Sequence, residues 1–164
     1  MSIETAAVRG VAVHYGPRTT TGKYGRAGND TGLVKTAEWT FDFNDLPTGS
    51  TDSLGVSIPA YAKIVSASLE ILVGFTSTST TTDLLIGLET AAGGTIDADG
   101  LVAAAEATQA AILTRGLNVV GAGSLVGAGV GSAAGKLVVA PSVDDLLTGK
   151  GRVTVEYTVE KVGN

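Results

Sequence analysis

Few residues in this chain could carry catalysis. The 164 residues include no Cys and a single His, His14, so a thiolate metal site or a cysteine nucleophile has no residue to build it. His14 stands beside Tyr15 near the N-terminus, far in sequence from any Ser in a strained elbow, and a serine–histidine triad is not expected. We expect that the protein is not an enzyme and binds no small-molecule substrate.

One acidic stretch has the spacing of a calcium-binding loop. In TIDADGLVAAAE, the third, fifth and twelfth positions are Asp97, Asp99 and Glu106, as such a loop requires. The first position is Thr95, however, and the residues before it cannot form an entering helix. The alternative is an Asp-Gly turn that caps a following helix without an ion. We favour the cap, and predict no metal site and no cofactor.

Two carboxylate pairs and a glycine-rich run also have structural explanations. The pairs Asp97 with Asp99 and Asp144 with Asp145 stand where helix starts use acids, and 5% aromatic residues are too few to line a glycosidase cleft. The run GAGSLVGAGVGSAAG at 121–135 matches neither a P-loop nor G-x-G-x-x-G. We expect its glycines to serve turns and close packing.

The charges divide the chain into a basic arm and an acidic body. Residues 1–29 carry four basic groups and one acidic group, a net +3, while residues 30–164 carry seven basic and fifteen acidic groups, a net −8. Residues 1–32 are too rich in Gly, Thr and charge to form a core, so they are either a solvated tail or an arm that orders on a partner. Nucleic acid is not expected, because the acidic body would repel phosphate. The predicted partner contacts are Arg9, His14, Tyr15, Pro17, Arg18, Lys23, Tyr24 and Arg26.

The clearest structural element is a long strand at residues 63–75. Apolar and polar residues alternate there with a period of two, which indicates a strand with one buried face. The residues predicted to face inward are Val65, Ala67, Leu69, Ile71, Val73 and Phe75. The polar connector TSTSTTT and the segment DLLIGLE follow, the latter with Leu84, Ile86 and Leu88 on one face. This order predicts a hairpin with a wide, exposed tip.

Other segments supply the rest of a sandwich. AEWTFDF at 37–43 alternates with Trp39, Phe41 and Phe43 on one face, so we expect a core strand that packs across from the long strand. Short strands are predicted at 117–120 and 136–140. A clean final strand is predicted at 152–160, with Val153, Val155, Tyr157 and Val159 facing inward. A helix is expected from Asp99 to Ile112, and one helical turn at 142–145 before a glycine-rich turn.

These elements predict one all-β domain with one short helix. Seven or eight strands without β-α-β alternation favour an antiparallel two-sheet β-sandwich of jelly-roll type, spanning residues 33–164, with residues 1–32 as an extended N-terminal arm. No segment approaches the about 20 apolar residues of a membrane span, and the N-terminal MSIETAAVRG lacks the basic segment and apolar run of a signal peptide. We therefore expect synthesis in a cytoplasm and no membrane partner.

Several segments, taken in order, resemble small head proteins of tailed bacteriophages. They are IPAYAKIVSASLEI, TSTSTTTDLLIGLET, GTIDADGLVAAA and a final RVTVEYTVE, and the resemblance covers residues 34–161. The type they resemble is the capsid decoration, or cement, protein with a jelly-roll body. The resemblance implies a structural protein, made in the host bacterial cytoplasm, that binds the outer surface of the assembled capsid. It also implies a homotrimer that clamps neighbouring subunits of the major capsid protein.

Two other functions remain open on the sequence. A glycan-binding sandwich module would require exposed aromatic residues or a metal, and a fibre-base module would share the fold but bind elsewhere on the virion.

Overall fold

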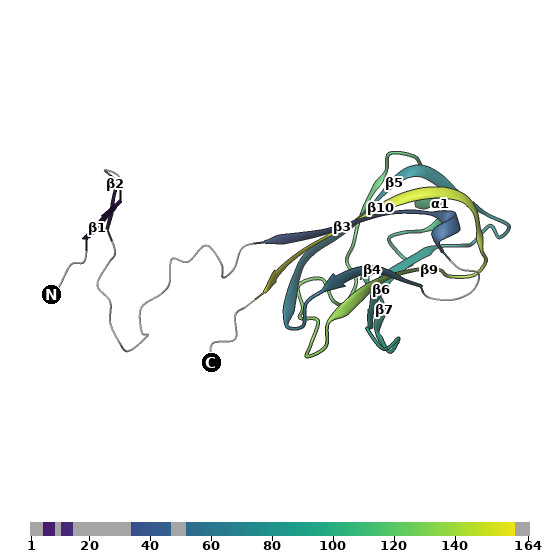
Figure 1. Cartoon of the computed structure of the whole chain (residues 1–164). Coiled ribbons are helices and arrows are strands. Elements are labelled where there is room, and N and C mark those ends of the chain that lie inside the picture. Colours follow the sequence, from purple (N-terminus) through teal and green to yellow (C-terminus); the bar gives the residue numbers. More distant parts are fainter. Residues whose placement is uncertain (1–4, 9–10, 15–33, 47–51, 160–164) are drawn as a thin grey trace.

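The computed structural model describes residues 5–8, 11–14, 34–46 and 52–159, and gives side-chain surroundings for 34–46 and 56–159. In this part of the chain it contains ten strands, one short α-helix and one 3-10 turn (Figure 1). The elements are β1 (Thr5–Val8), β2 (Val11–His14), β3 (Lys35–Asp42), η1 (Phe43–Asp45), β4 (Asp52–Ile58), β5 (Ala62–Ser77), β6 (Leu84–Thr90), β7 (Thr95–Val102), α1 (Gln109–Ile112), β8 (Asn118–Val120), β9 (Gly135–Pro141) and β10 (Leu146–Val159).

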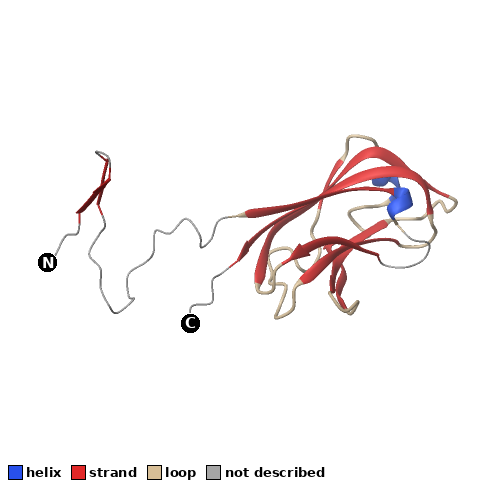
Figure 2. Ribbon diagram, in the orientation of Figure 1, coloured by secondary structure: helices blue, strands red, loops and turns tan. Residues whose placement is uncertain are grey.

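Eight of these strands form two packed antiparallel sheets, which confirms the predicted all-β sandwich (Figure 2). One sheet has the order β3-β10-β5-β8 and the other β4-β9-β6-β7. The first and last of the eight strands are therefore neighbours, and successive strands alternate between the sheets at the start of the chain, as in a jelly roll. The predicted arm contributes β1 and β2, which pair antiparallel in a two-stranded sheet of their own.

The predicted long strand is β5, and it lies in the middle of its sheet between β10 and β8. Its alternating pattern buries Ala67, Leu69, Ile71 and Phe75, as predicted. Val65 and Val73 were predicted to face the core, but they are 45% and 48% exposed. The pairing with β10 shifts register beside each of them, and such bulges reverse which face the following side chains occupy.

The predicted hairpin between β5 and β6 is wrong. The two strands lie in different sheets, and residues 78–83 carry the chain from one sheet to the other. Thr82 is buried in this connection and donates a hydrogen bond to the Ser77 hydroxyl at 3.0 Å. The inward positions Leu84, Ile86 and Leu88 are fully buried as predicted, because either arrangement turns the same face of β6 to the core.

The aromatic strand β3 was predicted to lie across from β5, but it lies in the same sheet with β10 between them. Phe41 is fully buried and stacks on Phe75 at a centroid distance of 5.6 Å. Trp39 stacks on Phe41 at 4.7 Å and is only partly buried. The three stacked aromatic side chains therefore all come from strands of one sheet.

The helix expected from Asp99 to Ile112 is mostly absent. Residues 95–102 form β7, where Leu101 and Val102 are buried, and the helix is only the single turn of α1. Ala residues fit a helix, but burial against β6 and the rest of the core decides the structure here. The first turn of α1 is capped by neither Asp97 nor Asp99, because the Gln109 backbone amide donates to Asp83 Oδ1 at 2.9 Å.

The helical turn expected at 142–145 and the glycine-rich turn after it are also wrong. Residues 142–144 form bends and Asp145 is irregular. Strand β10 then runs without a break from Leu146 through Gly149 and Gly151. These two glycines make room for aromatic rings. A Cβ atom at Gly149 would overlap the Phe75 ring, and one at Gly151 would meet the Phe41 ring at 2.9 Å.

The glycine-rich run packs closely against the two sheets, as its composition predicted. Gly121 donates its backbone amide to the Ala67 carbonyl at 2.9 Å, so it continues the pairing of β8 with β5. Further along, the Leu125 amide donates to the Gly100 carbonyl of β7 at 2.8 Å. The run thus joins the edge of one sheet to the edge of the other and closes that side of the sandwich.

Candidate functional site

The predicted contact residues of the arm fall almost entirely outside the described part of the chain. His14 is the last residue of β2, and only its backbone is described. The other seven predicted contacts, Arg9, Tyr15, Pro17, Arg18, Lys23, Tyr24 and Arg26, lie outside the described residues. Their role therefore stays a prediction.

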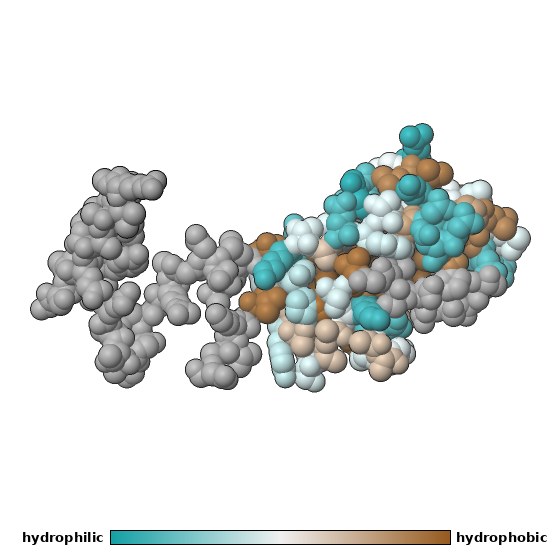
Figure 3. All heavy atoms as spheres, viewed as in Figure 1, coloured by the Kyte–Doolittle hydropathy of each residue, from teal (hydrophilic) through white to brown (hydrophobic). Residues whose placement is uncertain are grey.

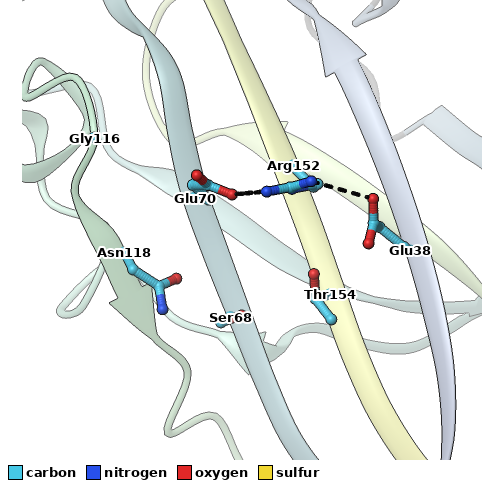
Figure 4. Close-up of a pocket in the computed structure, with 7 residues that line it drawn as sticks. All are labelled: Glu38, Ser68, Glu70, Gly116, Asn118, Arg152 and Thr154. Atoms are coloured by element: carbon cyan, nitrogen blue, oxygen red, sulfur yellow. Dashed lines mark hydrogen bonds and ion pairs between the residues drawn. The ribbon is translucent and has the colours of Figure 1, made fainter.

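The outer face of the β3-β10-β5-β8 sheet carries an open depression of about 430 Å³ (Figure 4). Alternation along β5 and β10 places their polar residues on this face. The register brings Arg152 opposite Glu70 on one side and opposite Thr40 of β3 on the other. The residues that line the depression are Glu38, Ser68, Glu70, Gly116, Asn118, Arg152 and Thr154.

Arg152 lies between two glutamates at the centre of this face. Its Nε donates to Glu70 Oε2 at 2.9 Å, its Nη2 contacts the same oxygen, and its Nη1 lies 3.5 Å from Glu38 Oε1. The hydrogen bond and charge of Glu70, followed by the charge of Glu38, raise the pKa of Arg152. One guanidinium therefore meets two carboxylates, and the cluster has a net charge of −1.

Both carboxylates that line the depression take part in ion pairs. A general base requires a carboxylate or imidazole that is free to take a proton, but both glutamates pair with Arg152. The seven lining residues include no aromatic side chain that could stack on a sugar ring. The depression is therefore a shallow polar surface of hydroxyl, amide and paired charged groups.

The acidic stretch around Asp97 forms hydrogen bonds within the protein. Ser124 donates to Asp97 Oδ2, and the Asp99 amide donates to Asp97 Oδ1 at 3.4 Å. The Ser124 hydrogen bond lowers the pKa of Asp97, and hydrogen bonding with Asp97 raises the pKa of Asp99. Glu106 accepts from the Ala103 amide at 2.6 Å. In the described part of the chain, no group of three or more His, Cys, Asp or Glu residues could hold a metal ion.

Tyr61 is a surface feature that sequence reasoning missed. It is the one residue other than glycine with a positive φ in the described ranges, at 59°, and its side chain is 59% exposed. It sits in the turn between β4 and β5, where the Ala62 amide donates to the Pro59 carbonyl at 3.2 Å. The signal in the sequence was the Pro59-Ala60 pair, which marks a turn but does not give the conformation of the residue after it.

The described residues contain no helix long and apolar enough to cross a bilayer. No protein-family model matches the chain, and no curated protein sequence does so either.

Three solved phage structures contain chains of similar fold. A chain of the cyanophage Pam1 capsid asymmetric unit is 18% identical, with a TM-score of 0.53 over 87% of this chain and 99% of that one. A chain of the Ralstonia phage GP4 capsid is 18% identical, with a TM-score of 0.55 over 85% and 92% of the two chains. A chain of the acid-stable capsid of Helicobacter pylori bacteriophage KHP30 is 20% identical, with a TM-score of 0.51 over 80% and 91%. The protein shares its fold with chains found in phage capsids.

Proposed function

We propose that this protein is a structural component of a tailed-phage virion and binds the outer surface of the assembled capsid. The observation that carries the proposal is the fold match, which covers 91 to 99% of three chains solved within phage capsids. In those capsids, a chain made almost wholly of this fold is part of the assembly. The match therefore extends over almost the whole of each capsid chain and is not limited to a common subdomain.

The protein is proposed to stabilise the capsid mechanically. A rigid sandwich that sits over a joint between major capsid protein subunits buries surface on both and opposes their separation. A homotrimer would present three such contacts at once, and multivalent attachment would raise a modest single-site affinity. In the depression on the outer sheet face, Glu38 and Glu70 both pair with Arg152, which agrees with a structural role.

The basic arm is proposed to attach the protein to the capsid surface. Residues 1–29 carry a net charge of +3 on a chain whose total is −5, so the arm would be attracted to an acidic capsid surface that repels the body. The proposed contacts are Arg9, His14, Tyr15, Pro17, Arg18, Lys23, Tyr24 and Arg26. Attachment through these charges would weaken as the salt concentration rises.

Co-sedimentation with phage shells that lack the protein tests this function. The full-length protein is expected to pellet with the shells in a saturable ratio and to raise the temperature at which they break open. A protein that stays in the supernatant with such shells would contradict the proposal. The same protein incubated with oligosaccharides is expected to show no shift in melting temperature; a shift would instead favour a glycan-binding module.

A further inference from the structure

The two ends of the sandwich differ in charge. At one end, Lys35 of β3 and Lys63 of β5 are exposed on either side of the last residues of β10, opposite Tyr157 and Thr158. Glu156, the carboxylate beside them, accepts a hydrogen bond from Ser66 at 2.8 Å. Tyr61 directly precedes β5 at this end, and we therefore call it the Tyr61 end. The basic arm also joins the sandwich here, because it leads directly into β3.

The opposite end, which we call the α1 end, is acidic. The Asp144 side chain accepts from Thr78 at 3.3 Å, and the Asp83 amide donates to Ser142 at 2.9 Å, so the connections 78–83 and 142–145 lie together. Asp83 also accepts from the first residue of α1. Asp144 and Asp145 are exposed. Figure 1 shows α1 and the start of β10 at the far end of the sandwich from the start of β3.

Each end also exposes large apolar side chains. At the Tyr61 end, Val34 is 52% exposed and Tyr61 59% exposed. At the α1 end, Val143 and Leu147 are 61% and 51% exposed. In the space-filling view, brown apolar atoms reach the surface toward both ends of the described body (Figure 3). Exposed apolar groups ringed by charge are typical of protein contact sites.

We propose that the Tyr61 end of one copy docks on the α1 end of a second copy. Lys35 and Lys63 would then face Asp144 and Asp145, and Tyr61 would lie against apolar groups of the α1 end. A symmetric contact between two like ends would instead set lysine against lysine or aspartate against aspartate, which is unfavourable. The charge distribution therefore favours a head-to-tail contact, which forms a closed ring or an open chain of copies.

The strained backbone conformation of Tyr61, with its positive φ, supports the same contact. A tyrosine at positive φ destabilises the folded chain, and its exposed ring gains little from the core of its own copy. Tyrosine is enriched at protein interfaces, where the ring supplies a large contact area with few rotatable bonds. A second copy would bury this ring.

Charge reversal in the full-length protein tests the proposal by sedimentation across a concentration series. One variant carries Lys35→Glu with Lys63→Glu, and the other carries Asp144→Lys with Asp145→Lys. Each alone is expected to weaken self-association by about tenfold or more, because like charges then face each other. Combining all four changes in one chain restores opposite charges across the contact, keeps the parent net charge, and is expected to restore association. An equimolar mixture of the two variants should also associate.

Three results would overturn the proposal. They are a parent protein that stays monomeric at every concentration in low salt, single-end variants that associate like the parent, and a combined variant that stays as weak as either. Circular dichroism of each variant shows that it is folded. Binding to shells is measured separately, so a monomer that still coats shells would overturn this inference and leave the proposed function standing.

Discussion

At the scale of single residues, Tyr61 occupies a backbone conformation that ordinarily belongs to glycine. Its φ is 59°, and its amide donates to the Gly131 carbonyl at 2.7 Å, which holds the turn in place. This conformation costs a residue with a side chain about 1–2 kcal/mol. The surrounding hydrogen bonds therefore maintain a strained residue at the surface.

Replacing Tyr61 by Gly is expected to stabilise the fold. The change removes the strain but adds freedom to the unfolded chain, so the net gain is about 0.5–1 kcal/mol, or a rise in Tm of about 2 °C. Thermal unfolding measures it. Tyr61→Ala is the matched control, because it removes the ring and keeps the strain, and it should give no such rise. If both variants gain equally, the ring and not the backbone is the source of the instability.

A second test at the residue scale concerns Asp97 and Ser124. The Ser124 hydrogen bond lowers the pKa of Asp97, so the folded state favours the ionised carboxylate. This contribution to stability is present at neutral pH and is lost as the pH falls through the lowered pKa. Ser124→Ala is expected to raise the pKa of Asp97 toward its ordinary value and to destabilise the fold at neutral pH only.

Carboxyl resonances followed by NMR during an acid titration measure this change directly. A residue-specific readout is needed, because the raised pKa of Asp99 changes stability with the opposite sign. Ser124→Thr keeps a hydroxyl group and should keep the pKa of Asp97 low. An Asp97 titration that is the same in Ser124→Ala and in the parent would show that the hydrogen bond is not the cause.

At the scale of elements, the glycine-rich run closes the sandwich only because its backbone approaches the strands closely. A Cβ atom at Gly121 would overlap the Leu101 carbonyl, which is backbone and cannot rotate away. Gly121→Ala is therefore expected to destabilise the fold by about 1–3 kcal/mol. Gly129→Ala is the control, since its new Cβ would lie 3.8 Å from the nearest atom, the Ala62 carbonyl oxygen.

Chemical denaturation of the two variants measures the difference. Gly129→Ala should unfold within about 0.5 kcal/mol of the parent, as surface substitutions usually do. Equal stability of the two variants would mean that the run can move away from β7 without loss.

The sequence predicted which segments are strands better than it predicted their neighbours. Alternation is a local property, so the buried faces of β6 and β10 and most of β5 were predicted correctly. Pairing is not local. The partners of β3 and β6 depend on which sheet each strand joins, and the short distance between β5 and β6 in the sequence favoured a hairpin that does not form.

Bulges and burial explain the remaining errors. A one-residue bulge in β5 reverses the phase of the pattern, and nothing in the residue types near Val65 or Val73 marks where it occurs. The alanine-rich residues 103–107 have high helix propensity, but Leu101 and Val102 gain more from burial in the core as part of β7. Gly149 and Gly151 are typical of a turn by type. Within the strand, Gly149 is explained by its φ of 131° and by the ring of Phe75, and Gly151 by the ring of Phe41.

At the scale of the whole molecule, the sequence and the structure suggest different candidates for a contact surface. The sequence predicted a basic arm on an acidic body, and the proposed contacts of the arm lie outside the described residues apart from the backbone of His14. The structure adds the outer sheet face and the two unlike ends of the sandwich. Neither could be predicted, because the strand order that brings Arg152 between Glu38 and Glu70 is not encoded in any local pattern.

Deleting residues 2–26 is expected to leave the sandwich folded and to weaken its attachment to shells. All of the eight strands of the two packed sheets lie after this segment, so the melting temperature should change little. Removing four basic residues, Arg9, Arg18, Lys23 and Arg26, should also make the remaining attachment less sensitive to salt. Undiminished attachment of the truncated protein would show that the arm is dispensable.

Electron cryomicroscopy of shells that lack the protein, imaged before and after addition of the full-length chain, tests the central claim most directly. We predict new density of sandwich size on the outer surface, at defined symmetry positions and across joints between capsid subunits. Density only on the inner surface or only where a tail or fibre attaches, or no added density at saturating protein, would contradict the account.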